Sequence, residues 1–210
     1  PIQGEGGVIP GNIQFFKQLR SFCTKEKILL IFDEVQSGMG RTGFLWGYQY
    51  LGVEPDIFTI AKGLGGGHAI GALLAKNHAN LFQQGDHAST FGGNPFACRA
   101  GLTVGEEIQR RNLLKNVLAR AHQLREGLIQ IIEHFSEELK EVRGVGLLQG
   151  LVIKEESSLN SQKVIHAAIK EKLLLVPAGQ KVVRMVPPLT ITKHEIDKLL
   201  RRLEASLESL

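Results

Sequence analysis

Hydrophobic residues repeat every three or four positions in several segments, and each repeat predicts an amphipathic helix. The first such helix begins at Asn12, a favourable N-cap, and another begins at Asn94-Pro95 and runs to about Arg110. The last helix opens with a capping box formed by Thr192 and Glu195. The expected helices cover residues 12–27, 94–110, 112–135, 164–169 and 192–207.

Short apolar runs between these helices predict strands. The run Ile28–Phe32 is apolar throughout, which is typical of a strand covered on both faces of a sheet, and Asp56–Ala61 is expected to be a second buried strand. Ala69–Ala75 follows closely enough to return antiparallel to the second run. Further runs lie at 146–154, 173–176 and 182–186. The pattern is therefore α/β over residues 1–111, followed by a smaller α+β domain over residues 112–210.

Composition excludes several classes of protein. Of the 210 residues, 43% are hydrophobic and 22% are charged, so the chain is neither disordered nor of low complexity. The net charge of +4 is spread along the chain and indicates no nucleic-acid surface. No apolar run is long enough for a membrane span, and no spacing of Cys and His predicts a metal site. Of the two cysteines, Cys98 is expected to be buried and inert.

Two of the predicted strands end in ionisable residues, Asp33 and Lys62, and each is followed by glycines. In open α/β sheets, ligands bind beyond the carboxyl ends of strands, so both side chains could face one ligand. Each could equally mark where a strand emerges into water. A lysine shielded at this place is a candidate Schiff-base nucleophile, and an aspartate beside it could hold a protonated pyridine nitrogen. Together they form a minimal pyridoxal phosphate signature.

Four ordered motifs resemble the class III aminotransferases of pyridoxal phosphate fold type I, and within them the acetylornithine and ornithine aminotransferases. They are Pro1–Gly7, Asp33–Gly43, Pro55–Gly63 and Ser89–Pro95, with further support from Pro177–Gly179 and Val183–Leu189. The resemblance runs the whole length of the chain. It implies the later part of the large cofactor-binding domain, with a mostly parallel sheet, and a small C-terminal α+β domain.

The resemblance also implies roles for particular residues. Lys62 would hold pyridoxal 5'-phosphate as a Schiff base and shuttle a proton, while Asp33 would keep the ring nitrogen protonated. Val35 would pack on the ring and Gln36 would bind near its phenolic oxygen. Without the motif, these two would be an ordinary core valine and a loop amide.

The remaining implied contacts concern the phosphate and the substrate. Ser89 and Thr90 would bind the cofactor phosphate, with Thr90 reaching the neighbouring site of a homodimer; without the motif they are a turn before a helix cap. Arg184 would receive a substrate carboxylate in a bidentate fork, and Glu5 would pair with it when the substrate brings an uncharged tail. A lone arginine in such a strand is otherwise solvated or paired.

The implied function is a cytoplasmic transaminase of arginine biosynthesis that uses N-acetylornithine and 2-oxoglutarate. Ornithine, succinylornithine and 4-aminobutyrate are alternative donors. Relatives place a phosphate loop and a ring-stacking aromatic before the position of Pro1, so the sheet is expected to lack strands and to expose an apolar face. The chain could then be a segment of a transaminase subunit, an inactive interaction module, or an unrelated α/β ligand-binding domain that mimics the motifs.

Overall fold

The computed structural model describes all 210 residues, and the chain divides into two compact units. The first unit contains Pro1 and Gly11–Leu113, and the second contains Ile2–Pro10 and Leu114–Leu210. Residues 2–10 therefore belong to the second unit, whereas the sequence pattern placed them in the first domain. The physical reason is packing, because the buried Val8 and the half-buried Ile2 contact an apolar cluster of the second unit that contains Leu148 and Val182.

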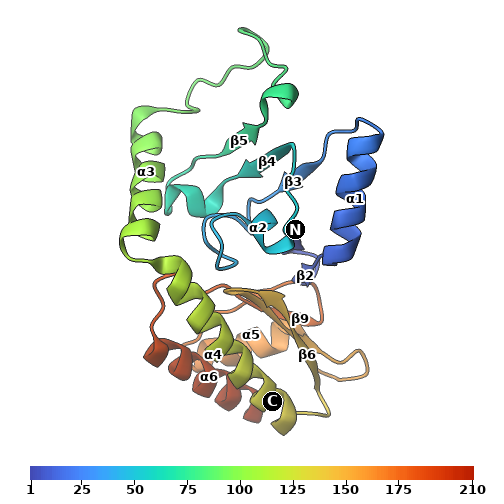
Figure 1. Cartoon of the computed structure of the whole chain (residues 1–210). Helices are drawn as coiled ribbons and strands as arrows, with labels where there is room; N and C mark the ends of the chain where they lie inside the picture. The colour runs from blue at the N-terminus through green and yellow to red at the C-terminus, as the bar shows by residue number, and fades with distance from the viewer. The chain divides into compact units, whose positions relative to one another are not determined.

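The first unit is built on a three-stranded sheet with the strand order β3-β4-β5 (Figure 1). Strands β3 and β4 run parallel, and β5 returns antiparallel to β4, as the short connection predicted. The elements of this unit are α1 (Ile13–Lys25), β3 (Ile31–Asp33), α2 (Gly47–Leu51), β4 (Ile57–Ile60), a 3-10 helix (Lys62–Gly65), β5 (Ala72–Ala75), a second 3-10 helix (Asn77–Ala79) and α3 (Pro95–Arg110).

Helix α1 covers one face of this sheet. Its N-cap Asn12 accepts a hydrogen bond from the backbone N–H of Phe15 at 2.9 Å, as the sequence predicted. Phe16 packs edge-on against Phe32 of β3, with ring centroids 5.3 Å apart. Cys23 is also buried in this core.

The other face of the sheet is open. Ile31 is 57% exposed and Leu73 of β5 is 51% exposed. The interpretation of residues 28–32 as a strand covered on both faces is therefore wrong, while the expected uncovered apolar face is confirmed. The strand itself covers only Ile31–Asp33, and Ile28 and Leu29 before it are exposed.

Cys98 differs from its prediction as well. It lies in the first turn and a half of α3 and is exposed, and its thiol donates to the carbonyl of Gly93 at 3.4 Å. The helix containing it has few neighbours in this chain, as the 71% exposure of Phe96 shows.

The second unit packs three helices on a four-stranded sheet with the order β6-β7-β9-β8. Its core joins residues of all three helices to the central strands, and its deeply buried members include Leu124, Leu128, Leu151, Val183, Ile196 and Leu203. The elements are β1 (Ile2–Gln3), β2 (Ile9–Pro10), α4 (Leu113–His134), β6 (Leu139–Val145), β7 (Leu148–Ile153), α5 (Ser161–Lys170), β8 (Val176–Pro177), β9 (Val182–Met185) and α6 (Lys193–Glu208).

The capping box of α6 is present as predicted. Thr192 accepts from the N–H of Glu195 at 3.3 Å, and Glu195 accepts from the N–H of Thr192 at 2.8 Å. No helix of the structure combines the length and the apolar character that crossing a membrane requires.

Candidate functional site

Asp33 and Lys62 lie at the carboxyl ends of two neighbouring parallel strands, as the sequence predicted. Asp33 is the last residue of β3 and is paired in register with Thr59 of β4. Lys62 follows β4 closely and begins the 3-10 helix. Parallel strands present their carboxyl ends at one edge of a sheet, so the amine and the carboxylate belong to the same edge.

The backbone at Lys62 adopts an uncommon conformation, with a φ of 45° in the left-handed region. This conformation is costly for a residue with a Cβ, and such residues concentrate at functional sites. The turn closes at Gly66, which is also left-handed, with a φ of 59°. Lys62 itself is exposed. The expectation that a lysine at this place is shielded is therefore wrong for the chain as it stands.

Asp33 is also exposed, and it organises the turn that follows it. Its Oδ1 accepts a hydrogen bond from the backbone N–H of Val35 at 2.9 Å. This short-range bond fixes the first turn after β3, in which Val35 and Gln36 are both half-buried. Of the three residues that the sequence grouped, Asp33 and Val35 are thus joined by one local hydrogen bond, and Gln36 follows in the same turn.

Glu34, between these residues, faces the interior and was not predicted as part of the site. Its carboxylate accepts from the backbone N–H groups of Gly47 and of Tyr48, the latter at 2.7 Å. Its own N–H donates to the carbonyl of Thr59 at 2.9 Å, and its carbonyl accepts from Gly38 at 2.9 Å. Burial raises the pKa of this carboxyl, although the two backbone N–H groups act in the opposite direction.

Glu34 therefore closes a loop that runs from β3 to α2. The loop interior contains two buried hydroxyls, Ser37 Oγ and Thr42 Oγ1, that have no hydrogen-bond partner. Burial lowers the pKa of Arg41 in the same loop to about 10, so its guanidinium remains charged at neutral pH. The only sequence signal for the role of Glu34 was an acid at the end of the apolar strand.

Ser89 and Thr90 lie in an exposed turn before α3. Ser89 Oγ accepts from the N–H of Gly92 at 2.9 Å. Asn94 then caps the helix, accepting from Ala97 at 3.0 Å, as predicted. Both hydroxyls are thus presented to solvent shortly before the N-terminus of a sixteen-residue helix.

Glu5 and Arg184 form an ion pair within the second unit. Arg184 Nη1 donates to Glu5 Oε1 at 2.8 Å. The arginine lies in β9 with a side chain only 8% exposed, whereas the glutamate side chain is 70% exposed. The pairing that the resemblance implied is present in the structure.

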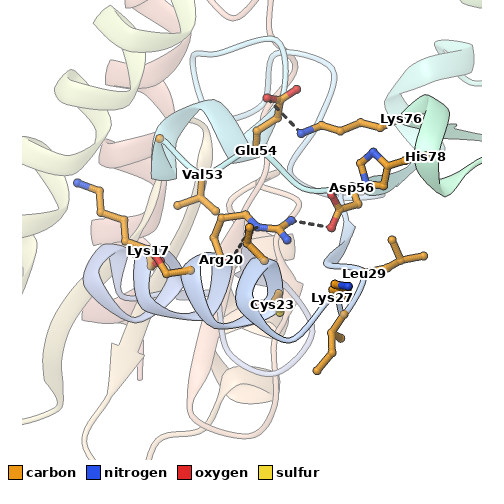
Figure 2. Close-up of a pocket in the computed structure, with 14 residues that line it drawn as sticks. Lys17, Arg20, Cys23, Lys27, Leu29, Val53, Glu54, Asp56, Lys76 and His78 are labelled. Atoms are coloured by element: carbon orange, nitrogen blue, oxygen red, sulfur yellow. Dashed lines mark hydrogen bonds and ion pairs between the residues drawn. The ribbon is translucent and has the colours of Figure 1, made fainter.

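A separate groove of about 780 Å³ lies in the first unit, at the end of the sheet where β3 and β4 begin and β5 ends. Figure 2 shows Arg20 of α1 and Asp56 joined across it, with Glu54 and Lys76 paired nearby. Its lining includes none of the predicted site residues. No cluster of three or more His, Cys, Asp or Glu side chains is placed to hold a metal ion.

Comparison with known proteins identifies relatives over the whole chain. A family model described as aminotransferase class-III matches residues 1–207. The acetylornithine aminotransferase of Prochlorococcus marinus (strain MIT 9313) is 64% identical over 207 residues, which are 99% of this chain and 50% of that relative.

Solved structures agree with this relationship. The N-acetylornithine aminotransferase of Stenotrophomonas maltophilia K279a superposes with a TM-score of 0.89 at 37% identity, and the ornithine delta-aminotransferase of Plasmodium falciparum with 0.93 at 32%. Each alignment covers 100% of this chain and 55% of the solved chain. The chain thus spans about half the length of the curated relatives it matches.

Proposed function

The chain belongs to the class-III aminotransferases, and on that premise we propose that it carries the Schiff-base centre of a pyridoxal phosphate-dependent transaminase. The observation that supports this most strongly is the placement of Lys62 and Asp33 at the carboxyl ends of adjacent parallel strands. The donor proposed is N-acetylornithine and the acceptor is 2-oxoglutarate, in arginine biosynthesis in the cytoplasm.

The residues present suit pyridoxal phosphate in their chemistry. A primary amine is needed for the Schiff base, a carboxylate for the ring nitrogen, and hydroxyl and N–H donors for the phosphate. Lys62, Asp33 and the Ser89-Thr90 turn offer these groups, and all are exposed and accessible to a ligand. When bound, the cofactor supplies an electron sink for the carbanion that forms at the substrate carbon.

The protein side of the reaction is then divided between two residues. The Lys62 amine would bind the cofactor and, once the substrate amine has displaced it, would carry a proton from the substrate carbon to C4′ of the cofactor. The Asp33 carboxylate would hold the proton on the ring nitrogen. Its Oδ1 is oriented by the N–H of Val35, so the carboxylate does not have to reorganise when the ring arrives.

Val35 and Gln36 are proposed to contact the ring face and its phenolic oxygen. Ser89 and Thr90 are proposed to bind the phosphate, with Thr90 serving the neighbouring site of a homodimer. The exposure of this turn and of Phe91, at 82%, supports a surface that another polypeptide segment covers.

Arg184 is proposed to bind a substrate carboxylate, and Glu5 to neutralise it when the reacting carbon of the substrate bears no carboxylate. The strong difference in exposure supports this division, because a buried guanidinium is held in place while an exposed carboxylate is able to swing aside. The pair would thus let one site accept both an amino donor whose reacting carbon bears no carboxylate and a dicarboxylic oxo acid.

A second candidate function is an interaction module without activity. The open apolar face of the first unit, with Ile31 and Leu73 exposed, favours it. One experiment separates the two. The chain is assayed alone, and after completion with the half of a curated relative that it does not span, against N-acetylornithine, ornithine, succinylornithine and 4-aminobutyrate with 2-oxoglutarate.

Fastest turnover of N-acetylornithine by the completed chain is the expected result. Turnover of 4-aminobutyrate alone would contradict the proposed donor. Absence of any transamination in a completed chain that is folded would contradict the proposed enzyme and favour the interaction module.

A further inference from the structure

Two arginines flank a glycine across the sheet of the second unit. Arg143 of β6 is paired in register with Gly150 of β7, and Gly150 is paired in register with Arg184 of β9. Residues directly opposite one another on neighbouring strands project to the same face of a sheet. Arg143 and Arg184 therefore stand on the same face, with the position between them left free of a side chain.

The turn Gly4–Val8 occupies the space above Gly150. A Cβ added at Gly150 would lie 3.0 Å from the Cβ of Val8 and 2.9 Å from a methyl group of Val182. Val8 is fully buried, and its N–H donates to the carbonyl of Gly4 at 3.3 Å. Its φ of 54° is costly for a β-branched residue, so the surrounding contacts must hold this turn in place.

The two arginines bind this turn at different points. Arg184 donates to the side chain of Glu5 at 2.8 Å, and Arg143 Nε donates to the backbone carbonyl of Gly7 at 2.7 Å. The approach of Arg143 also depends on Gly7 lacking a side chain, because a Cβ there would lie 2.9 Å from Arg143 Nη2. One arginine thus contacts an exposed side chain of the turn and the other contacts its backbone.

We propose that Arg143 is a positioning residue for the Glu5–Arg184 pair, and that it sets the balance between the two substrates at this site. The inference rests on the proposed function of that pair. Because Arg143 anchors the peptide at Gly7, exchange of substrates moves only the Glu5 side chain and leaves the backbone of the turn fixed. Without the anchor, the turn loosens and Glu5 neutralises Arg184 less often.

Removing the Arg143 side chain should therefore have the same kind of effect on substrate preference as removing the Glu5 carboxylate, but a smaller one. Both changes leave the charge of Arg184 uncompensated when a donor binds whose reacting carbon bears no carboxylate. Both should lower kcat/KM for N-acetylornithine relative to kcat/KM for 2-oxoglutarate. Their effects should not add, because once Glu5 cannot neutralise Arg184 its position no longer matters.

The test uses the completed chain with Arg143→Met, Glu5→Gln and the double variant. Arg202→Met is the matched control, since Arg202 also donates one bond to a backbone carbonyl, that of Lys172 at 2.8 Å, but far along the chain from the turn. Single-turnover kinetics give the specificity constant of each half-reaction. Hydrogen exchange at the Val8 amide gives a readout that does not depend on activity.

We expect Glu5→Gln to lower the donor-to-acceptor ratio of kcat/KM about tenfold, which corresponds to the loss of one charge-assisted hydrogen bond. Arg143→Met should lower it about threefold, and the double variant should match Glu5→Gln. Exchange at Val8 should accelerate about tenfold in Arg143→Met and remain unchanged in Arg202→Met, as for the loss of one hydrogen bond.

The outcomes distinguish the proposed function of the Glu5–Arg184 pair from the positioning role of Arg143. An unchanged ratio in Glu5→Gln would overturn the proposed role of the ion pair, and with it this inference. A changed ratio in Glu5→Gln with an unchanged ratio in Arg143→Met would overturn the inference alone. Additive effects in the double variant would also overturn it, because they would show that Arg143 acts independently of Glu5.

Discussion

Asp56 stabilises the alignment of the two strands that carry Asp33 and Lys62. It lies directly before β4 with a side chain only 7% exposed. Its carboxylate accepts from Arg20 Nη1 at 2.6 Å and from the backbone N–H of Leu30 at 2.8 Å, and it contacts His78 Nε2 at 3.1 Å (Figure 2). Replacing Asp56 by Ala removes all three contacts at once.

The expected loss of unfolding free energy follows from the groups that lose their hydrogen-bond partner. The N–H of Leu30 loses its carboxylate acceptor in a buried position, which costs about 1–3 kcal/mol. The partly buried guanidinium of Arg20 also loses its carboxylate partner and keeps the bond of its Nε to Thr24 Oγ1 at 3.1 Å, and the loss of this charged hydrogen bond brings the total to about 3–5 kcal/mol. The control is Glu54→Ala, because Glu54 is exposed and pairs with Lys76 at 3.4 Å, so its loss should cost less than about 1 kcal/mol.

The assay is urea unfolding followed by the fluorescence of Trp46, the single tryptophan of the chain. Its ring lies 5.2 Å from that of Phe58, so the emission reports on the first unit. Equal losses of stability in Asp56→Ala and Glu54→Ala would refute the reasoning.

The stabilising effect of Asp56 should also depend on pH. Burial alone raises the pKa of Asp56, but the Leu30 N–H, Arg20 and His78 together hold it below its usual 3.8. The ionised side chain therefore stabilises the fold above that pH, and the contribution is lost as pH falls through the depressed value. The difference in unfolding free energy between wild type and Asp56→Ala should shrink when the solution is acidified below about pH 4.

Three further predictions concern other parts of the chain. Cys98 should react with a thiol reagent in the native protein and Cys23 only after unfolding; protection of both would contradict the exposed position of Cys98. Gly144→Ala should cost about 3 kcal/mol or more in thermal unfolding, because φ is 120° and the new Cβ would overlap a backbone carbonyl oxygen of the next strand. Gly105→Ala, in open helical surroundings, should instead stabilise by about 1 kcal/mol, and equal effects would refute this difference. Wild type should lose stability relative to Glu34→Gln as pH rises above the usual 4.5, because burial raises the Glu34 pKa; parallel pH profiles would contradict it.

Much of the fold followed from local patterns in the sequence. The caps at Asn12, Asn94 and Thr192 placed three helix starts correctly, since capping depends on side chains within three residues. The strand β6 was missed because polar residues such as Lys140 and Glu141 interrupt its alternation and a glycine lies within it. The sequence also could not predict whether both faces of the sheet are covered. A continuous apolar run indicates that a strand favours apolar contacts on both faces, but it does not show that a helix or strand is there to make them.

The same distinction between local patterns and long-range contacts applies to the candidate site. Asp33, Lys62, Glu5 and Arg184 were predicted from motifs, and the structure brings the last two together as an ion pair. Glu34 and Arg143 were missed because their roles depend on backbone groups distant in sequence, at Gly47 and Gly7. Almost every residue type offers a backbone carbonyl and N–H, so the sequence does not indicate which distant residue such a side chain contacts.

The measurement that tests the central claim most directly is the attachment point of pyridoxal phosphate. The completed chain is incubated with the cofactor, reduced with borohydride, digested and mapped by mass spectrometry, with Lys62→Arg in parallel. A pyridoxyl group on Lys62, and no stoichiometric labelling of the variant, is the predicted result. Equal labelling of other lysines such as Lys17 or Lys27, unchanged in Lys62→Arg, would contradict the assignment of this lysine as the Schiff-base residue.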